Sequence, residues 1–327
     1  MIYRNKISYS GVITNYVCNA ECRHCMYMSS PKCRKDFITA DASENIAKTL
    51  ADSGVSSVHI GGGEPFINFD ALCNILRALQ KHGVGVDYVE TNAFWCSDES
   101  IISRRLSAIK ALGVECVMAS VDPFHIEYVP LARPLLLCKM LAAHGMEYFI
   151  WQERYLRKMI KLDHDRTYSH DELKDILGEN YVTETAKEYG LGINGRALTI
   201  AEDIYKKQPC DEILKQRTSC SSLFSTQHCH IDLYGNVIPS GCPGISVELG
   251  DFIKFANGEA VTDVTKYPVV SKLISGGLNA LYTYARTLGF TADEGGYATP
   301  CALCVDIRTY LNEHSPSFDV APDCFYR

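Results

Sequence analysis

Three cysteines near the start of the chain are spaced like the ligands of a metal centre. Cys18, Cys22 and Cys25 form a C-x3-C-x2-C pattern on one short segment. Thiolates suit iron–sulfur clusters and zinc. Three of them can hold three corners of a four-iron cluster and leave the fourth iron open to a ligand. Two of them can instead belong to a closed zinc site completed from elsewhere, so the spacing alone predicts a metal and leaves its kind open.

A glycine-rich turn follows a short apolar run about forty residues later. Residues 55–60 read as a buried strand that leads directly into Gly61, Gly62, Gly63 and Glu64. Glycines allow the backbone to approach a ligand closely, and one carboxylate follows them. The pattern predicts a ligand contact at the carboxyl end of this strand.

Together the two motifs resemble the radical S-adenosylmethionine enzymes. In that family the cysteine loop holds a [4Fe–4S] cluster, and its open iron chelates the amino and carboxylate groups of S-adenosylmethionine. The resemblance implies that the three cysteines are the cluster ligands. It also implies that Gly62, Gly63 and Glu64 meet the methionine amino group, and that His24 lies near the adenine.

Apolar runs rich in β-branched residues alternate with helical patterns, which is typical of βα units and a parallel sheet. Six such repeats match the partial (β/α)6 TIM-like barrel that the resemblance implies, with its chemistry at the carboxyl ends of the strands. We therefore expect an α/β fold with a barrel domain at 1–204 and a cysteine-rich α+β domain at 205–327. The expected strands are 11–17, 55–61, 84–91, 115–121, 146–152 and 191–196, and the expected helices are 42–53, 68–82, 98–112, 134–144 and 169–189.

Polar side chains at the expected strand ends are candidates for cofactor contacts. An arginine there can pair with a cofactor carboxylate through two parallel hydrogen bonds. The alternative is that these residues only form turns or carry a solvated charge. The candidates are Thr91, Asn92, Ser120, Asp122 and Arg196.

One histidine is a candidate for proton transfer once a substrate radical has formed. His125 follows the fourth expected strand, and Tyr128 and Asp122 are weaker candidates. A lone histidine is more often structural.

The charged and aromatic segment 153–171 is either a cover over the barrel mouth or a solvated loop.

A second group of cysteines follows residue 205. Cys220 and Cys242 flank an expected hairpin at 230–239, and a C-x2-C pair follows at Cys301 and Cys304. These four are our candidate ligands for a second metal site, with zinc as the alternative metal. The layout resembles the twitch version of the SPASM extensions of radical S-adenosylmethionine enzymes, which implies an auxiliary [4Fe–4S] cluster.

The match to those extensions is incomplete. The chain lacks the last two cysteines of the full SPASM pattern, and six residues separate Gly235 from Cys242 where the family usually has four. Cys229 is a substitute for Cys220, and Cys324 is a candidate for a further site. The other cysteines are expected to be small buried residues, with Cys33, close to the first loop, the exception to watch.

The composition indicates the cellular location and the kinds of partner to expect. The 327 residues include 15 cysteines and carry a net charge of −7. With no signal-like start and no apolar run of about 18 residues, we expect a reducing cytoplasmic location. The acidic balance argues against nucleic acid or a membrane as partner. The resemblance implies an external one-electron reductant, of flavodoxin or ferredoxin type.

The predicted function is reductive cleavage of S-adenosylmethionine to a 5′-deoxyadenosyl radical, which removes a hydrogen atom from a substrate C–H bond. The auxiliary cluster would assist a net oxidation or bond formation on a small molecule or a ribosomal peptide. The alternative is a non-catalytic iron–sulfur electron carrier or a zinc-binding module. Gly62, Gly63 and Glu64 argue against it, because an electron carrier does not need an open iron or a ligand contact.

Overall fold

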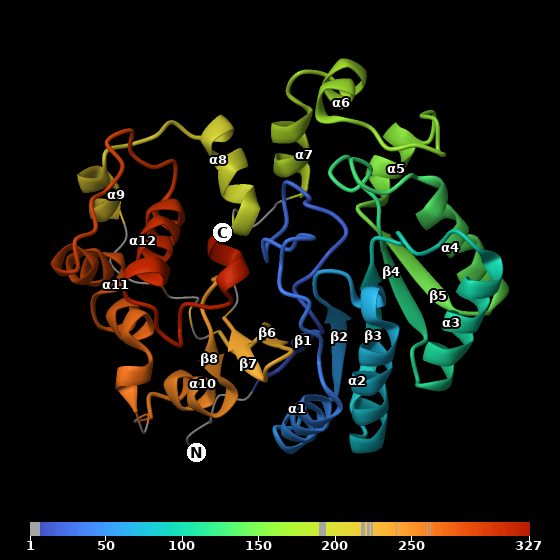
Figure 1. The fold of residues 1–327 in the computed structure, drawn as a ribbon, viewed down its shortest axis with the longest axis horizontal. Helices are drawn as coiled ribbons and strands as arrows, with labels where there is room; N and C mark the ends of the chain where they lie inside the picture. The colour runs from blue at the N-terminus through green and yellow to red at the C-terminus, as the bar shows by residue number, and fades with distance from the viewer. Residues whose placement is uncertain are drawn as a thin grey trace.

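The computed structural model describes residues 7–189, 194–216, 220, 223, 225–239, 241–259, 261 and 263–327. Eight strands in this part of the chain form one sheet in the order β5-β4-β3-β2-β1-β6-β7-β8 (Figure 1). The strands β1 to β6 are parallel, and β7 and β8 run antiparallel to their neighbours. The strands are β1 Ser10–Ile13, β2 Ser57–Gly61, β3 Gly85–Thr91, β4 Cys116–Ser120, β5 Glu147–Trp151, β6 Cys229–Asp232, β7 Asn236–Ile238 and β8 Val247–Glu248.

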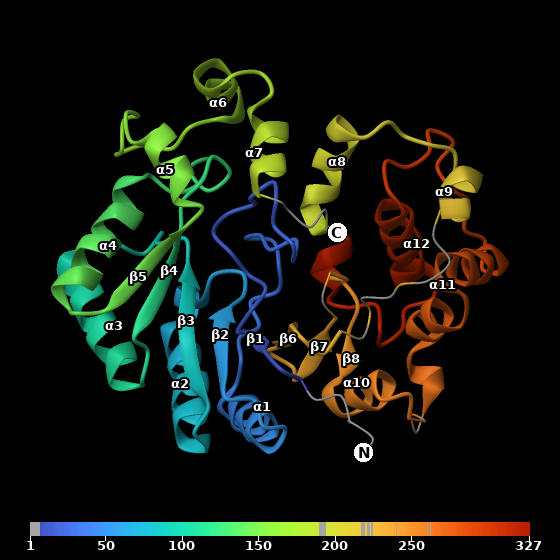
Figure 2. The ribbon, with the colours of Figure 1, turned by 180° about the vertical axis from the view of Figure 1, so that it is seen from behind.

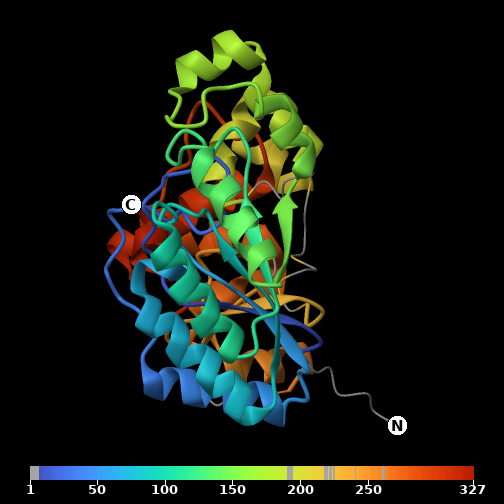
Figure 3. The same cartoon turned by 90° about the vertical axis from the view of Figure 1, so that its right-hand side faces the viewer.

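Helices alternate with the first five strands and bury apolar faces against the sheet. Their ends follow local sequence signals: the side chain of Thr39 caps α1, that of Asp98 caps α3, and Gly83 ends α2 in the left-handed conformation. Figure 3 shows these helices with the sheet turned by 90° from Figure 1. They are α1 Ala40–Asp52, α2 Phe69–His82, α3 Glu99–Ala111 and α4 Ala132–Ala143.

Four shorter helices follow β5 and lie above the upper ends of the strands in Figure 1. Tyr155, Met159 and Tyr168, from the segment 153–171, are buried in a small core with Leu173 and Tyr181. This segment is therefore packed rather than merely solvated. The helices are α5 Glu153–Met159, α6 His170–Leu177, α7 Tyr181–Tyr189 and α8 Leu198–Ile204.

The C-terminal part continues the same sheet through the β6–β7 hairpin. Helices pack beside that hairpin, with α11 and α12 side by side (Figure 2). In α11 the helical backbone is interrupted at Gly276 and Gly277. The helices are α9 Cys210–Gln216, α10 Leu249–Ala256, α11 Pro268–Thr287 and α12 Pro300–His314, and single 3-10 turns occur at Pro65–Asn68, Gly195–Ala197, Val264–Lys266 and Asp323–Tyr326.

The expected α/β class with a parallel, open sheet is confirmed, and five of the six expected strands are present. The sixth, 191–196, is not a strand where the structure describes it, and residues 190–193 lie outside the described part. Gly195, with φ +56°, begins a 3-10 turn because the chain there packs on the first cysteine loop. Instead, β6 from the hairpin pairs with the free side of β1. The boundary between the two expected domains stays a prediction.

Among the described helices, none combines the length and the apolar character that crossing a membrane requires.

Candidate functional site

A cavity of about 430 Å³ lies at the carboxyl ends of the barrel strands. It collects most of the barrel residues predicted from sequence. Asp122 and Arg196 are not among its lining residues, but both bond to residues that are. The predicted residues that line it are Cys18, Cys22, His24, Cys25, Gly62, Gly63, Glu64, Thr91, Asn92, Ser120 and His125.

The loop between β1 and α1 presents Cys18, Cys22 and Cys25 to the cavity. Backbone hydrogen bonds fix this loop: Cys18 N donates to Ser30 O at 3.2 Å, and Cys25 N donates to Cys22 O at 3.0 Å. Burial raises the pKa of the Cys18 and Cys25 thiols. A metal must therefore displace their protons, which couples binding to proton release.

Two further side chains fit a polar ligand in this cavity. The hydroxyls of Tyr27 and Ser29 are buried, line the cavity and have no hydrogen-bond partner among the described residues. Buried polar groups are rarely left unsatisfied. Together with three thiols on one wall, this donor set fits a [4Fe–4S] cluster with one open iron and a polar ligand beside it.

Arg196 holds the cysteine loop from outside. Its Nη1 donates to Cys22 O at 2.7 Å, its Nη2 donates to Ser29 O at 2.9 Å, and its backbone N donates to Cys25 O at 3.0 Å. A Cβ on Gly195 would lie 2.2 Å from Met26 O, so the close approach requires glycine. The guanidinium is thus engaged with the loop, and the expected contact with a cofactor carboxylate stays a prediction.

Glu64 is 1% exposed and accepts three hydrogen bonds from protein donors. Its Oε1 accepts from Phe66 N at 3.0 Å and Thr91 Oγ1 at 2.9 Å, and its Oε2 accepts from Asn92 N at 2.8 Å. Burial raises the pKa of Glu64 to about 7, although these hydrogen bonds lower it. Thr91 and Asn92 therefore orient this carboxylate at the edge of the cavity.

The glycines before Glu64 permit close packing of two chain segments. A Cβ on Gly63 would lie 2.1 Å from Val17 O, and one on Gly62 would lie 2.7 Å from Asn15 O. Asn92 Nδ2 lies 3.6 Å from Cys18 Sγ. The glycine-rich turn is thereby fixed directly beside the cysteine loop.

His24, Asp122 and His125 form a compact group whose side-chain ligand atoms lie within 4.8 Å of one another. His125 Nδ1 and Asp122 Oδ2 are 2.6 Å apart. Burial lowers the pKa of His24 to about 4. Burial also opposes charge on His125, but Asp122 and a hydrogen bond with Cys22 raise its pKa well above the usual value. His125 therefore links Asp122 to a predicted cluster ligand, whereas Tyr128 Oη donates to Glu21 O at 3.1 Å.

A second cavity, of about 420 Å³, is lined by all four cysteines of the predicted second site, Cys220, Cys242, Cys301 and Cys304. Burial raises the pKa of Cys242 to about 12, and the other three thiols add to the rise. Arg308 lines the same cavity, and its buried Nε has no hydrogen-bond partner among the described residues. Cluster sulfides are acceptors for such a group, so this set fits an auxiliary cluster.

The two reserve cysteines lie elsewhere. Cys229 is buried in β6 and forms a hydrogen bond with Ser10, and the thiol of Cys324 forms a hydrogen bond with the thiol of Cys33. Neither is among the residues that line the second cavity.

Among the residues of the first cavity that were not identified from sequence are three histidines, His59, His228 and His230. His228 and His230 alternate at the start of β6, and His59 lies in β2. The H-x-H pattern of His228 and His230 could have indicated two of them. The contact of His59 with these two depends on the register of the strands, which the sequence pattern does not give.

Comparisons with known proteins match the barrel part of the chain. Residues 12–146 match the sequence model of the radical SAM superfamily. A GTP 3′,8-cyclase of Peptoclostridium acidaminophilum is 27% identical over 133 residues, 39% of each chain. The putative peptide biosynthesis protein YydG of Bacillus subtilis (strain 168) is 22% identical over 116 residues, 34% of this chain and 35% of that one. The chain thus spans about two fifths of the length of the curated relatives it matches.

Among solved structures, native anSMEcpe with bound AdoMet is 14% identical with a TM-score of 0.46, covering 93% of this chain and 97% of that one. The structure of BtrN in complex with AdoMet and 2-DOIA is 13% identical with a TM-score of 0.43, covering 82% of both chains.

Proposed function

Because residues 12–146 of this chain are a radical SAM domain, we propose that the protein is an enzyme that reductively cleaves S-adenosylmethionine and takes a hydrogen atom from a substrate C–H bond. The observation that carries this is the shared cavity: Cys18, Cys22 and Cys25 face the same space as Gly62, Gly63 and Glu64. An electron carrier needs no such cavity beside its cluster.

Different residues of the first cavity bind the cluster and S-adenosylmethionine. The three cysteines hold the cluster, and Gly62, Gly63 and Glu64 receive the methionine amino group. His24, Thr91, Asn92, Ser120 and Asp122 surround the rest of the cofactor, directly or through a neighbour. Arg196 keeps the cysteine loop in place, since its guanidinium donates to two loop carbonyls.

When bound, the cluster and S-adenosylmethionine supply a 5′-deoxyadenosyl radical: one electron from an external flavodoxin- or ferredoxin-like reductant breaks the C5′–S bond and releases methionine. The hydrogen atom from the substrate then gives 5′-deoxyadenosine and a substrate radical. The buried side chain of Met118 gives the cavity an apolar wall, which helps to keep water from this step.

We assign the second cavity to an auxiliary [4Fe–4S] cluster held by Cys220, Cys242, Cys301 and Cys304. Four thiolates would leave this cluster no open iron for substrate, and it would accept the electron that the substrate radical loses. His125, next to the first cavity, is the candidate for moving the accompanying proton. A net oxidation or bond formation follows, on a small molecule or a ribosomal peptide, in the reducing cytoplasm that fifteen cysteines favour.

YydG, which is named a putative peptide biosynthesis protein, supports a peptide, and the GTP 3′,8-cyclases support a small molecule. Both substrate classes therefore belong to the proposal.

The test is anaerobic reconstitution with iron and sulfide, followed by S-adenosylmethionine and a strong reductant. We expect about eight irons per chain and formation of 5′-deoxyadenosine that Cys22→Ala abolishes. Cys116→Ala is the matched control, because Cys116 lies in β4 and lines neither cavity. No 5′-deoxyadenosine from the wild-type protein with any reductant would overturn the proposal.

A further inference from the structure

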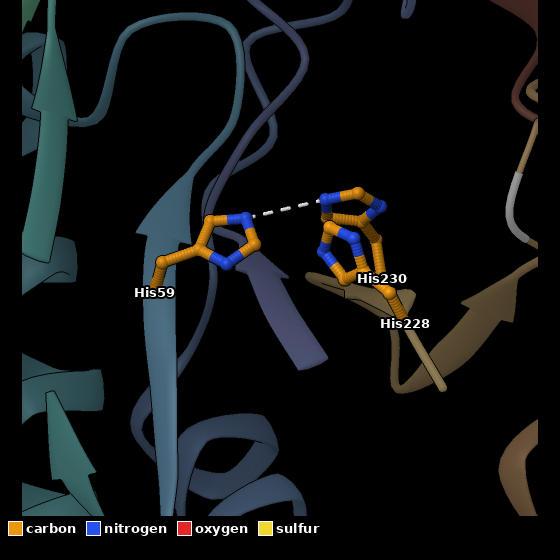
Figure 4. A group of neighbouring side chains, drawn as sticks. All are labelled: His59, His228 and His230. Atoms are coloured by element: carbon orange, nitrogen blue, oxygen red, sulfur yellow. Dashed lines mark hydrogen bonds between the residues drawn. The ribbon is translucent and has the colours of Figure 1, made fainter. Parts of the chain in front are cut away.

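Three adjacent strands place one histidine on each side of a glycine. In the register of β2, β1 and β6, Gly11 pairs with His59 on one side and with His230 on the other. A Cβ on Gly11 would lie 2.3 Å from His59 Nε2 and 2.4 Å from His230 Cδ2. Because glycine has no side chain, the two imidazoles meet across β1, with their Nε2 atoms 3.2 Å apart (Figure 4).

A third imidazole completes the group. His228 stands beside His230, and the ligand nitrogens of the three histidines lie within 4.8 Å of one another. Figure 4 shows the rings gathered from two sides, His59 from β2 and the other two from the start of β6. His59 is buried, whereas His228 is exposed, and all three line the first cavity. The group is therefore open to a ligand on the cavity side.

The buried histidine is oriented by neighbours that do not compete for its facing nitrogen. Its Nδ1 lies 3.3 Å from Tyr9 Oη, and Tyr9 in turn bonds to Asp87. The ring of Tyr88 stacks on His59 at 5.2 Å. A hydrogen bond on Nδ1 leaves the Nε2 lone pair directed at His230, which is how neighbours commonly orient metal-ligating histidines.

The two facing nitrogens suit a metal ion better than a shared proton. Two neutral imidazoles can share only one proton, whereas a metal ion accepts both lone pairs. Glu90 Oε1 lies 3.7 Å from His59 Nε2 and adds a nearby carboxylate.

We propose that His59, His228 and His230 bind one divalent transition-metal ion, zinc or one of similar preference, with a coordination position open to the cavity. Three imidazoles with an open position suit zinc and its neighbours. A substrate carboxylate, thiolate or amide would fill that position and be held below the predicted radical. This last role rests on the proposed function, but metal binding does not.

The experiment uses the reconstituted protein with its clusters, freed of loose metal by a chelator and titrated anaerobically with Zn²⁺ against an indicator. We expect one zinc per chain. His228→Ala, which removes an exposed ligand with little risk to folding, should weaken binding more than about 100-fold. Tyr9→Phe should weaken it about tenfold, since it only orients His59.

Gly11→Ala tests the site most directly, because it keeps all three histidines and fills the space between His59 and His230. It should abolish zinc binding. His314→Ala, an exposed histidine at the end of α12, should leave binding unchanged. Iron and sulfide contents of each variant report whether the barrel has folded.

Co²⁺ then identifies the ligands, because thiolate ligation gives an intense near-ultraviolet charge-transfer band and imidazole ligation does not. Zinc uptake that His228→Ala and Gly11→Ala leave intact, or a thiolate band, would overturn the site. Protein that binds zinc but never forms 5′-deoxyadenosine would refute the proposed function and leave the metal site standing. The reverse result would refute the metal site alone.

Discussion

Two cavities of similar size, about 430 and 420 Å³, are lined by cysteines, but the chain builds them in different ways. In the first, the cysteines lie within eight residues of one another, and their loop is fixed by its own backbone hydrogen bonds. In the second, the cysteines come from segments up to 84 residues apart, between Cys220 and Cys304. A contiguous loop can be preorganised locally, whereas the second set depends on the whole C-terminal part having folded.

The charges around the two cavities differ as well. Buried carboxyl groups, Glu64 and Asp122, stand at the first. At the second stands a buried cation, Arg308, whose Nη1 donates to Pro243 O at 2.9 Å. Polar and acidic groups suit the binding of a charged cofactor, and a buried cation offsets the negative charge of a cluster held by four thiolates. The first cavity thus suits the proposed charged cofactor, and the second suits the proposed electron-accepting cluster.

The largest test of this contrast removes one cysteine from each cavity. Cys22→Ala should abolish 5′-deoxyadenosine formation, because the two remaining thiolates cannot hold the first cluster. Cys304→Ala should lower iron from about eight to about four per chain and still permit 5′-deoxyadenosine formation, while product formation is lost. Iron, sulfide and 5′-deoxyadenosine are measured on the same preparations. Equal loss of 5′-deoxyadenosine in both variants would remove the distinction between the cavities.

The contrast also explains how much could be predicted from the sequence. The first loop and the run Gly62, Gly63 and Glu64 are contiguous motifs, so both could be recognised in the sequence, and the family resemblance then implied how they work together. The four later cysteines were selected by their position around a hairpin, and the structure brings them together.

Contacts between residues far apart in sequence could not be predicted. Arg196 contacts carbonyls 167 and 174 residues away in sequence, and His59 meets His230 at a separation of 171 residues. In the described part of the expected sixth strand, Gly195 begins a 3-10 turn instead, because it packs against the backbone of the cysteine loop.

A smaller effect concerns the proton at the first cavity. His125→Gln should slow substrate conversion about 100-fold if the imidazole moves a proton, and 5′-deoxyadenosine formation without substrate should fall much less. Tyr128→Phe is the control, because it removes only the hydrogen bond to Glu21 O. If substrate conversion and 5′-deoxyadenosine formation fall equally and the reduction potential of the first cluster shifts, His125 acts only through its hydrogen bond with Cys22.

Arg196→Lys should loosen the first loop without unfolding the barrel. Lysine keeps the charge but cannot reproduce the two guanidinium hydrogen bonds to Cys22 O and Ser29 O. Losing one charge-assisted bond costs about 1.5–3 kcal/mol, so iron release to a chelator should be at least tenfold faster. Binding of S-adenosylmethionine to the intact cluster should change less. Weakened cofactor binding with normal iron retention would instead show a direct contact with the cofactor.

The smallest expected effect concerns Asp232, at the carboxyl end of β6. This carboxyl is 2% exposed and accepts from Tyr16 Oη at 3.1 Å and from Tyr234 N and Asn236 N, both at 3.0 Å. It joins the segment before Cys18 to the hairpin before Cys242. Burial raises its pKa from 3.8 to about 6, although these donors lower it.

Because the folded chain keeps the Asp232 proton to higher pH than the unfolded chain, this group stabilises most below about pH 3.8 and loses that contribution as pH rises through about 6. Between pH 5 and 7 the loss is about 1 kcal/mol. Asp232→Asn cannot ionise, so its free energy of unfolding should rise by that amount relative to wild type over the same interval. Anaerobic guanidinium denaturation at several pH values measures the difference. A constant difference would mean that Asp232 is ionised throughout, and that its three hydrogen-bond donors outweigh the effect of burial.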